Sequence, residues 1–271
     1  MTKENNKHVL SVVIPVYKQE KTIGRDLKRI EEVLQKTRYD YEIIAVIDGR
    51  MDNSEEEAKK ITSKKIKVTG YEYNHGKGYA VRFGMARTVG DYVAFIDSGM
   101  DLNPRGLTMA LEHLEWYNAD IIVGSKRHPV SKVNYPFHRR VISFGYQVII
   151  HLLFGFKITD TQVGLKIYRR EVLEKVLPRL LVKQFAFDVE ILAVAHRLGF
   201  KRIYEAPVEL DFTGKSSVSS MTTMDFWRLI FKTFMDTLAI FYRLRILHYY
   251  DDHNQRKWRY DEDLAMRVNV G

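Results

Sequence analysis

The sequence predicts an α/β fold built on a doubly wound, mostly parallel sheet. Over the first 210 residues, short apolar runs alternate with amphipathic runs whose apolar residues recur every three or four positions. The apolar runs have the length of buried strands and the amphipathic runs have the periodicity of helices. Hydrophobic residues make up 45% of the chain and charged residues 28%, the balance of a folded globular protein. This alternation is typical of parallel strands joined by helices.

The strands and helices of this first part follow one another along the chain. Strands are expected at Val9–Val16, Tyr41–Ile47, Ile66–Thr69, Tyr92–Ile96 and Ile121–Val123. Helices are expected at Lys21–Gln35, Ser54–Ser63, Gly78–Val89 and Pro104–Glu115. The first helix carries Ile23, Leu27, Ile30 and Leu34 on one face, and the last begins at a proline, which suits a first helical position.

Two later segments differ from this pattern. Val141–Phe156 is apolar with His151 as its one ionisable group, and Asp225–Leu247 combines Phe, Trp, Leu and Ile with four basic residues. Basic, aromatic amphipathic helices favour a membrane interface. The alternative is that both helices pack on the sheet or on another subunit. We therefore expect a catalytic domain over 1–212 that includes an interfacial helix at about 139–156, a membrane-associated segment over 213–250, and a polar tail over 251–271 that frays.

Composition limits the partners and the location. The net charge of +9 favours anionic partners, yet no basic-aromatic motif of a nucleic-acid module is present. The chain has no cysteine, so disulfides and thiolate metal sites are excluded. Residues 1–8 are polar, which predicts no signal peptide, and no uncharged apolar run reaches 18 residues. These features predict a peripheral protein on the cytoplasmic face of a membrane.

The most informative motif is the end of the strand Tyr92–Ile96. Asp97 follows the strand directly, and Asp101 comes four residues later. A carboxylate at a strand's carboxyl end faces the crevice where open α/β sheets bind ligands. Paired acidic oxygens there suit Mg²⁺ or Mn²⁺ holding a diphosphate. Gly99 stands where a second carboxylate would be expected.

Three further loops have residues that suit a nucleotide. Pro15 and Tyr17 end the first strand, and an aromatic ring with polar groups there can hold a base. Asp48 ends the second strand and could accept hydrogen bonds from a base or a ribose. Lys77 lies between two glycines before a helix, a pattern that suits an anion. Each loop taken alone is equally compatible with an ordinary turn.

Seven motifs in this order resemble the family 2 glycosyltransferases, which have the GT-A fold. They are Val13-Ile14-Pro15-Val16-Tyr17, Asp48-Gly49 with Asp52, Asn74-x-Gly76-Lys77-Gly78, Phe95-Ile96-Asp97, Ala119–Arg127, Thr159–Lys166 and Phe187–Leu192. The resemblance covers roughly residues 9–247 and is greatest for the dolichyl- or polyprenyl-phosphate hexosyltransferases of the glucosyl type. Mannosyl relatives often carry Arg three residues before the late glycine, where this chain has Asp211 before Gly214.

The resemblance implies an inverting transfer of a hexose from a nucleotide-diphosphate sugar to a dolichyl or polyprenyl phosphate. UDP-glucose is favoured as the donor, and GDP-mannose remains open. The implied donor-binding residues are Pro15, Tyr17, Glu20, Asp48, Lys77 and Asp97, and the implied metal ligands are Asp97 and Asp101. Arg127, Arg139 and Ser143 are implied to bind the acceptor phosphate, and Asp97, Asp101 and Arg127 to act in catalysis. Asp160, Gln162, Lys166, Asp188 and Glu190 occupy other motif positions.

Gly99 leaves competing hypotheses, because the family's metal motif is Asp-x-Asp. One is an active transferase in which Asp101 supplies the missing charge, and Gly99→Asp then raises transfer. Another is a non-catalytic relative that binds nucleotide or lipid as a scaffold, and a third is a family member with a non-lipid acceptor. The sequence leaves the oligomeric state open, including a homo-oligomer.

Overall fold

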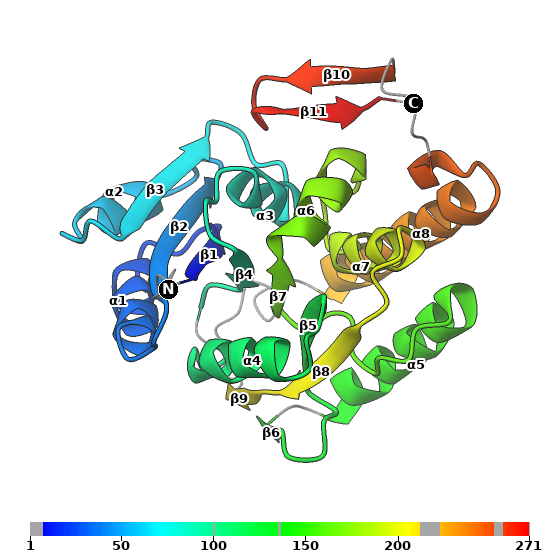
Figure 1. Ribbon diagram of the computed structural model, residues 1–271, viewed down its shortest axis with the longest axis horizontal. Helices are drawn as coiled ribbons and strands as arrows, with labels where there is room; N and C mark the ends of the chain where they lie inside the picture. The colour runs from blue at the N-terminus through cyan, green and yellow to red at the C-terminus, as the bar shows by residue number, and fades with distance from the viewer. Residues whose placement is uncertain (1–7, 100, 135–136, 212–222, 252–256, 271) are drawn as a thin grey trace, which may run out of the picture.

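A computed structural model describes residues 8–99, 101–134, 137–211, 223–251 and 257–270 (Figure 1). Its main feature is a seven-stranded sheet in the order β3-β2-β1-β4-β7-β5-β8. The strands are β1 (Val9–Val16), β2 (Asp40–Asp48), β3 (Ile66–Tyr71), β4 (Tyr92–Ile96), β5 (Ile121–Ser125), β7 (Leu165–Arg169) and β8 (Ile203–Pro207). The pairs within β3-β2-β1-β4 and the β5-β8 pair are parallel, while β7 is antiparallel to both its neighbours. The predicted mostly parallel sheet is confirmed.

Helices cover both faces of this sheet (Figure 1). They are α1 (Ile23–Leu34), α2 (Ser54–Lys59), α3 (Lys77–Met85), α4 (Arg105–Trp116), α5 (Phe137–Phe154), α6 (Arg170–Val176), α7 (Phe187–Arg197) and α8 (Thr223–Arg245), with short 3-10 turns η1 (Leu177–Arg179) and η2 (Tyr249–Asp251). Two further strands, β6 (Lys132–Asn134) and β9 (Glu209–Asp211), form a small parallel pair.

The central strands are apolar at most positions because each of their faces is covered by a separate core. In β1, Val13 joins the core under α3, α6 and α7, while its neighbours Val12 and Ile14 join the core under α1 and α4. Successive side chains of a strand point to opposite faces, so a strand buried on both sides needs apolar residues throughout. For this reason, the sequence predicts both ends of β1 correctly.

The last 20 residues differ from the expectation of a frayed polar tail. Trp258–Asp261 (β10) and Met266–Asn269 (β11) form an antiparallel hairpin, and Leu264 in its turn is 1% exposed. Tyr250, just before it, is fully buried and donates a hydrogen bond of 2.7 Å to Glu190. The few apolar residues of this polar segment are the ones that pack on the core, so composition alone concealed the fold.

The two apolar segments form the long helices α5 and α8. Among the described residues, neither these nor any other helix is long and apolar enough to cross a bilayer. The helices contact each other through a hydrogen bond of 2.7 Å between Tyr146 Oη and Thr237 Oγ1. Both also carry large apolar side chains that the rest of the chain leaves exposed, including Leu152 at 77% and Phe231 at 65%.

Candidate functional site

The predicted site residues gather at the carboxyl edge of β1, β2 and β4. The chain leaves β1 toward β2 on one side, while β4 pairs with β1 on the other side. Ligands of open α/β sheets bind at such a switch point, in the crevice beyond the strand ends. Asp48 ends β2, and Asp97 follows β4.

Four charged side chains form a chain of ion pairs at this edge. Lys77 Nζ lies 2.9 Å from Asp97 Oδ1 and 3.2 Å from Asp188 Oδ2. Lys166 Nζ lies 2.5 Å from Asp188 Oδ1 and donates a second hydrogen bond to the Val163 carbonyl. The sequence placed Lys166 and Asp188 in motifs without a role, and the structure brings both to Lys77.

Burial and the neighbouring charges together determine the pKa values of Lys77, Asp188 and Lys166. For Lys77, burial opposes the charge, but the carboxylates of Asp188 and Asp97 outweigh it and raise its pKa. For Asp188, burial favours the neutral acid, yet Lys166 and Lys77 outweigh it and lower its pKa. Burial lowers the pKa of Lys166, and Lys77 adds to this effect while Asp188 opposes it. Lys77 is therefore a fixed cation beside Asp97.

Asp97 is held by its backbone and leaves its carboxylate facing the crevice. Its N–H donates to the Gly164 carbonyl at 2.8 Å. A Cβ on Gly164 would lie 1.8 Å from Asp97 Oδ2, so only glycine leaves room for this carboxylate. Oδ1 faces the Lys77 ammonium without a well-aligned hydrogen bond, and the side chain is 41% exposed. Oδ2 accepts a hydrogen bond of 3.1 Å from Lys77 Nζ, and a carboxylate of this kind is a suitable ligand for a hard divalent cation.

The turn after Asp97 explains the glycine at position 99. Gly99 has a φ of +95°, a conformation that side chains other than glycine rarely adopt. Its N–H donates to Oδ2 of Asp26, a buried α1 carboxylate, at 3.3 Å. Asp101 lies in the same turn and is partly buried. No group of three or more metal-ligating side chains occurs among the described residues, and the role of Asp97 and Asp101 as metal ligands stays a prediction.

Asp48 is buried and its carboxylate receives hydrogen bonds from the chain itself. The donors are Tyr71 Oη, Asn74 Nδ2 and the backbone N–H groups of His75 and Gly76. Asp48 therefore fixes the loop that precedes Lys77 and orients that side chain. The structure shows this positioning contact, whereas the predicted contact with a base or ribose stays a prediction.

The other predicted donor residues lie at the end of β1. Pro15 is buried within the strand, and Tyr17 is partly exposed just beyond it. Glu20 Oε2 accepts the Asn53 N–H at 3.2 Å, which joins the loop after β1 to the loop after β2. Lys18, with its ammonium 5.3 Å from the Tyr17 ring, adopts a φ of +52°.

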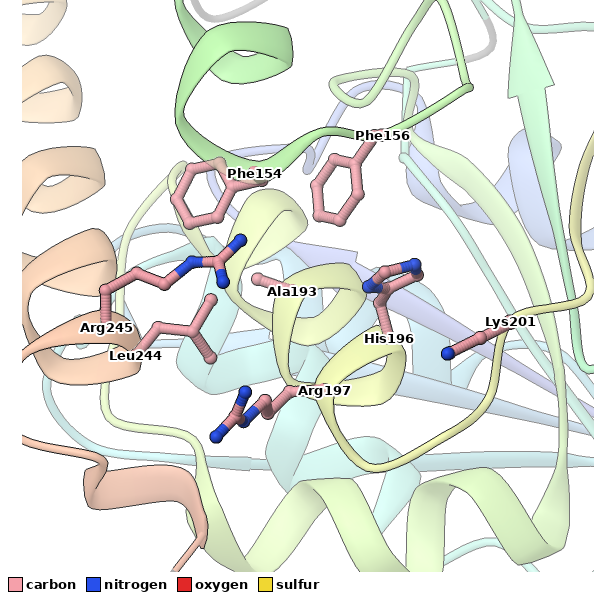
Figure 2. Close-up of a pocket in the computed structure, with 8 residues that line it drawn as sticks. All are labelled: Phe154, Phe156, Ala193, His196, Arg197, Lys201, Leu244 and Arg245. Carbon is pink, nitrogen blue, oxygen red and sulfur yellow. The ribbon is translucent and has the colours of Figure 1, made fainter.

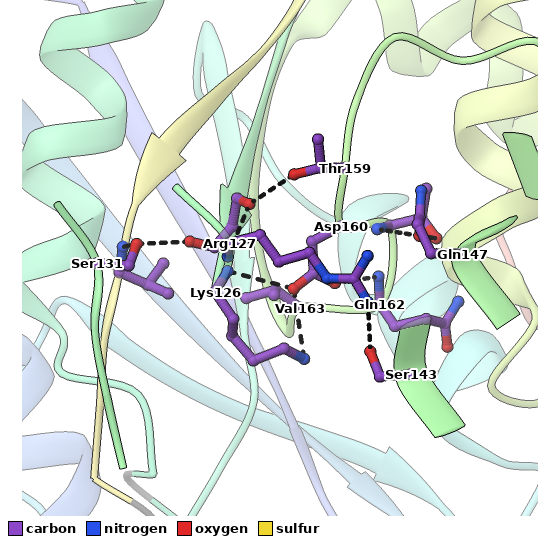
Figure 3. A network of polar contacts seen from close by, with 12 residues as sticks. Lys126, Arg127, Ser131, Ser143, Gln147, Thr159, Asp160, Gln162 and Val163 are labelled. Atoms are coloured by element: carbon purple, nitrogen blue, oxygen red, sulfur yellow. Dashed lines mark hydrogen bonds and ion pairs between the residues drawn. The ribbon is translucent and has the colours of Figure 1, made fainter. Parts of the chain in front are cut away.

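A second cationic group lies beyond β5 (Figure 3). Arg127 Nη2 donates to Ser143 Oγ of α5 at 3.2 Å, so two of the three predicted acceptor residues meet. Lys126 donates its N–H to Asp160 Oδ2 at 3.2 Å, and its ammonium lies 3.5 Å from the same oxygen. Arg139 lies in α5, but its side chain is outside the described part of the chain.

One loop, residues 159–164, connects both groups. Asp160 Oδ1 accepts the Gln162 N–H at 3.3 Å, and the Gln162 side-chain nitrogen is buried without a partner. Gln147 of α5 holds the loop by accepting the Thr161 N–H, and Glu205 of β8 holds it by accepting a hydrogen bond from the Thr159 hydroxyl. Gln147, Glu205 and Asp26 belong to none of the sequence motifs, because a polar residue within a helix or strand does not stand out in the sequence.

Glu190 lies outside this site. Its carboxylate is fully buried and accepts the N–H groups of Leu181 and Val182 and the Tyr250 hydroxyl. Burial raises its pKa. Glu190 therefore anchors the turn before α7 and the residues that lead into the C-terminal hairpin.

Comparisons with known proteins identify the family of this chain. The model of a family described as "Glycosyl transferase family 2" matches residues 11–177. A dolichyl-phosphate beta-glucosyltransferase of Drosophila melanogaster is 32% identical over 205 residues, which are 70% of this chain and 63% of that protein. The Homo sapiens protein of the same name is 30% identical over 254 residues, covering 88% of this chain and 76% of that protein. The chain thus spans less than two thirds of the Drosophila relative.

Solved structures support the fold. Glucosyl-3-phosphoglycerate synthase from Mycobacterium tuberculosis, in complex with Mn²⁺, UDP and phosphoglyceric acid, has a TM-score of 0.65 and 19% identity, and the match covers 88% of this chain and 80% of that one. Mannosyl-3-phosphoglycerate synthase from Rubrobacter xylanophilus has a TM-score of 0.66 and 17% identity, with 88% and 74% covered. The expected GT-A fold is confirmed.

Proposed function

The chain belongs to glycosyl transferase family 2, and from that premise we propose that it transfers glucose from UDP-glucose to the phosphate of a polyprenyl or dolichyl lipid. Relatives named dolichyl-phosphate beta-glucosyltransferase support the acceptor and the sugar. Solved neighbours that contain UDP and Mn²⁺ support the donor and a divalent metal.

The observation that carries the proposal is that the clusters around Lys77 and Arg127 contact the two ends of one short loop. Gly164 accepts the Asp97 N–H beside Lys77, and Asp160 accepts the Lys126 N–H beside Arg127. Four residues span at most about 14 Å, so the two clusters are held close together. A reaction between two phosphate-bearing substrates requires two such cations close together.

The group around Lys77 is assigned to the donor. Its ammonium would contact the donor diphosphate and offset the charge that develops on the leaving UDP. Asp97 and Asp101 would hold Mg²⁺ or Mn²⁺, which adds further charge neutralisation when bound. Asp188 and Lys166 keep the Lys77 side chain in place.

The group around Arg127 is assigned to the acceptor. A guanidinium matches the oxygens of a phosphate with two parallel donors, and Ser143 adds a hydroxyl. A phosphate monoester has its second pKa at about 6 and is already a dianion near neutral pH. The acceptor therefore needs no general base to become a nucleophile.

The reaction follows from this placement. A phosphate oxygen attacks the anomeric carbon from the side opposite UDP, a carbon–oxygen bond forms, and the bond to the diphosphate breaks with its electrons leaving on UDP. No proton has to move in this step. Bringing the two anions together in one orientation is the main task of the protein.

The exposed apolar stripes of α5 and α8 would place the acceptor. Phe144, Val148 and Leu152 of α5, and Trp227, Phe231 and Met235 of α8, recur every four residues and are exposed. Ser143 adjoins the first stripe in sequence. Residues of this kind, with Arg228 and Lys232 on α8, suit the interface of a membrane whose lipid supplies the phosphate.

The proposal is tested with labelled UDP-glucose or GDP-mannose, polyprenyl phosphate and Mg²⁺ or Mn²⁺, followed by lipid extraction. We expect label in the lipid from UDP-glucose. A non-catalytic relative would bind UDP but transfer no label from either donor, and a family member with a soluble acceptor would transfer label only when that acceptor replaces the lipid.

A further inference from the structure

A second cavity, separate from the site described above, lies where α5, α7 and α8 end (Figure 2). Its volume is about 190 Å³, room for several water molecules. Phe154 is the last residue of α5, Arg245 the last of α8, and His196 lies in the last turn of α7. Asp188 is at the opposite end of α7, eight residues or about 12 Å from His196.

The floor of this cavity is apolar. Phe154 and Phe156 stack with ring centroids 5.6 Å apart, and both are 4% exposed. The Leu244 and Ala193 side chains complete the floor. Such a floor repels a free, fully hydrated ion and accepts a ligand with carbon atoms next to its charge.

The rim is basic. Arg245, Lys201, His196 and Arg197 line it, and Figure 2 shows Arg245 and Lys201 on opposite sides of His196. Arg197 is held by Asp251 through two hydrogen bonds. Within the described ranges, neither Arg245 nor Lys201 has an acidic partner in an ion pair. Burial, then the charges of Lys201 and Arg245, lower the pKa of His196, so both cations act on the same small space.

Helix ends alone do not explain this arrangement. The carboxyl end of a helix attracts cations, which accounts for Arg197 and Arg245. Lys201 lies beyond the end of α7, and the buried aromatic pair between these cations needs no charge around it. An apolar floor beside two cations that have no ion-pair partner in the described part of the chain is what a phosphate group attached to carbon would match.

We propose that this cavity binds the phosphate of an anionic phospholipid headgroup, at a site distinct from the proposed acceptor site. The lipid source is favoured because the cavity lies at the ends of α5 and α8, the helices with exposed apolar stripes, and Ile246 directly after Arg245 is 60% exposed. The same chemistry would also admit a soluble phosphate ester, and the experiment separates the two.

Binding of the full chain is measured by co-sedimentation with phosphatidylcholine vesicles, with and without phosphatidylglycerol, in the absence of donor. The test variant carries Lys201→Glu and Arg245→Glu. The control carries Lys28→Glu and Arg29→Glu, which change the net charge equally on the exposed side of α1. Since each basic residue near an anionic surface contributes about 1 kcal/mol, we expect the test variant to lose about tenfold or more in affinity for the anionic vesicles.

The control should lose clearly less, and Lys201→Arg with Arg245→Lys should retain binding. Equal losses in the test and control variants would overturn the proposal, since binding would then follow net charge alone. In a second arm, glycerol phosphate is titrated at constant ionic strength while the His196 ring resonances are followed by NMR. Saturable shifts of the His196 resonances in a protein that does not bind the anionic vesicles would assign the cavity to a soluble phosphate ester. If glycerol phosphate causes no shift and the test variant binds the vesicles as well as the unaltered protein does, both sources are contradicted. No sugar transfer is measured, so the outcome is independent of the proposed reaction.

Discussion

The Lys77 ammonium lies 2.9 Å from a carboxylate oxygen of Asp97, the residue on which the family's metal motif centres. Asp188 contacts Lys77 from the other side at 3.2 Å, and Lys166 in turn contacts Asp188. The Lys77 ammonium is therefore held in a fixed position between two carboxylates, next to the residues proposed to hold the donor and its metal. The predictions below follow from this arrangement and from its counterpart around Arg127.

Replacing Lys77 by Met should reduce transfer strongly. The substitution removes a charge aimed at the leaving diphosphate, a contribution worth about 10²–10³-fold in rate at comparable sites. The change should be measured as kcat/KM for UDP-glucose. Lys77→Arg is the matched control, because it keeps the charge, and it should retain more activity than Lys77→Met. Equal activity in the Met variant and the unaltered protein would contradict the role given to Lys77.

Replacing Lys166 by Met should destabilise the fold more than it affects substrate binding. Lys166 is fully buried, and its loss would leave Asp188 in the core with Lys77 as its one remaining ion-pair partner. Breaking a buried ion pair by removing one partner costs about 3–5 kcal/mol. Urea unfolding measures the free energy. The double variant Lys166→Met, Asp188→Leu should recover part of the loss, and no recovery would show that the charge pairing is not the cause.

The stabilisation from Asp188 should depend on pH in the acid range. Its folded-state pKa is lowered below the ordinary 3.8 against burial by Lys166 and Lys77. A lowered acid pKa stabilises the folded state above the unfolded pKa, and this contribution disappears as pH falls through the folded value. The difference in unfolding free energy between the unaltered protein and Asp188→Asn should be constant from pH 7 to about 5 and shrink below about 4. A difference in unfolding free energy that grows on acidification would contradict the lowered pKa of Asp188.

Introducing a carboxylate at position 99 should not restore a conventional metal motif. The sequence predicts that Gly99→Asp raises transfer if the metal site is merely weakened. The φ of +95° changes that expectation, because a side chain there costs about 1–2 kcal/mol although no atom lies closer than 3.9 Å to its Cβ. We expect Gly99→Asp and Gly99→Ala to lose similar stability in thermal unfolding and to show no gain in transfer. A rise in transfer confined to the Asp variant would show that the site lacks a ligand.

Replacing Arg127 by Ala should weaken binding of the acceptor more than binding of the donor. Hydrogen bonds to a charged group contribute about 1.5–3 kcal/mol, which corresponds to an increase of about tenfold to a hundredfold in the KM for polyprenyl phosphate. The KM for UDP-glucose should change much less. Ser143→Ala removes only the hydroxyl that contacts Arg127 and should give a smaller increase. A larger effect on the donor would place Arg127 on the other side of the crevice.

Much of the fold was predictable because a strand that is buried on both faces is a continuous apolar run in the sequence. Val9–Val16 and Tyr92–Ile96 match the expected bounds, since both are apolar at every position except Ser11. The hairpin after Tyr250 was wrongly expected to fray, because two buried residues, Leu264 and Val268, hold a segment that is otherwise polar. Contacts made by one or two residues with a distant part of the chain cannot be predicted from the composition of the segment.

The sequence motifs do not show how their residues contact one another. The motifs identified Lys77, Asp97, Lys166 and Asp188, yet nothing in their spacing shows that they form one continuous chain of ion pairs. Nothing in the sequence distinguishes Asp26, because an acidic residue on an amphipathic helix is normally solvated. Only the fold shows that it is buried and accepts a hydrogen bond from the Gly99 turn.

Transfer of label into lipid tests the central claim most directly. The unaltered protein and Lys77→Met are each incubated with labelled UDP-glucose, polyprenyl phosphate and Mn²⁺, and the label in the extracted lipid is counted over time. The proposal predicts label that depends on the lipid phosphate and falls by about 10²-fold or more in the variant. Binding of UDP-glucose without any label in the lipid, under these conditions and with GDP-mannose in its place, would contradict it.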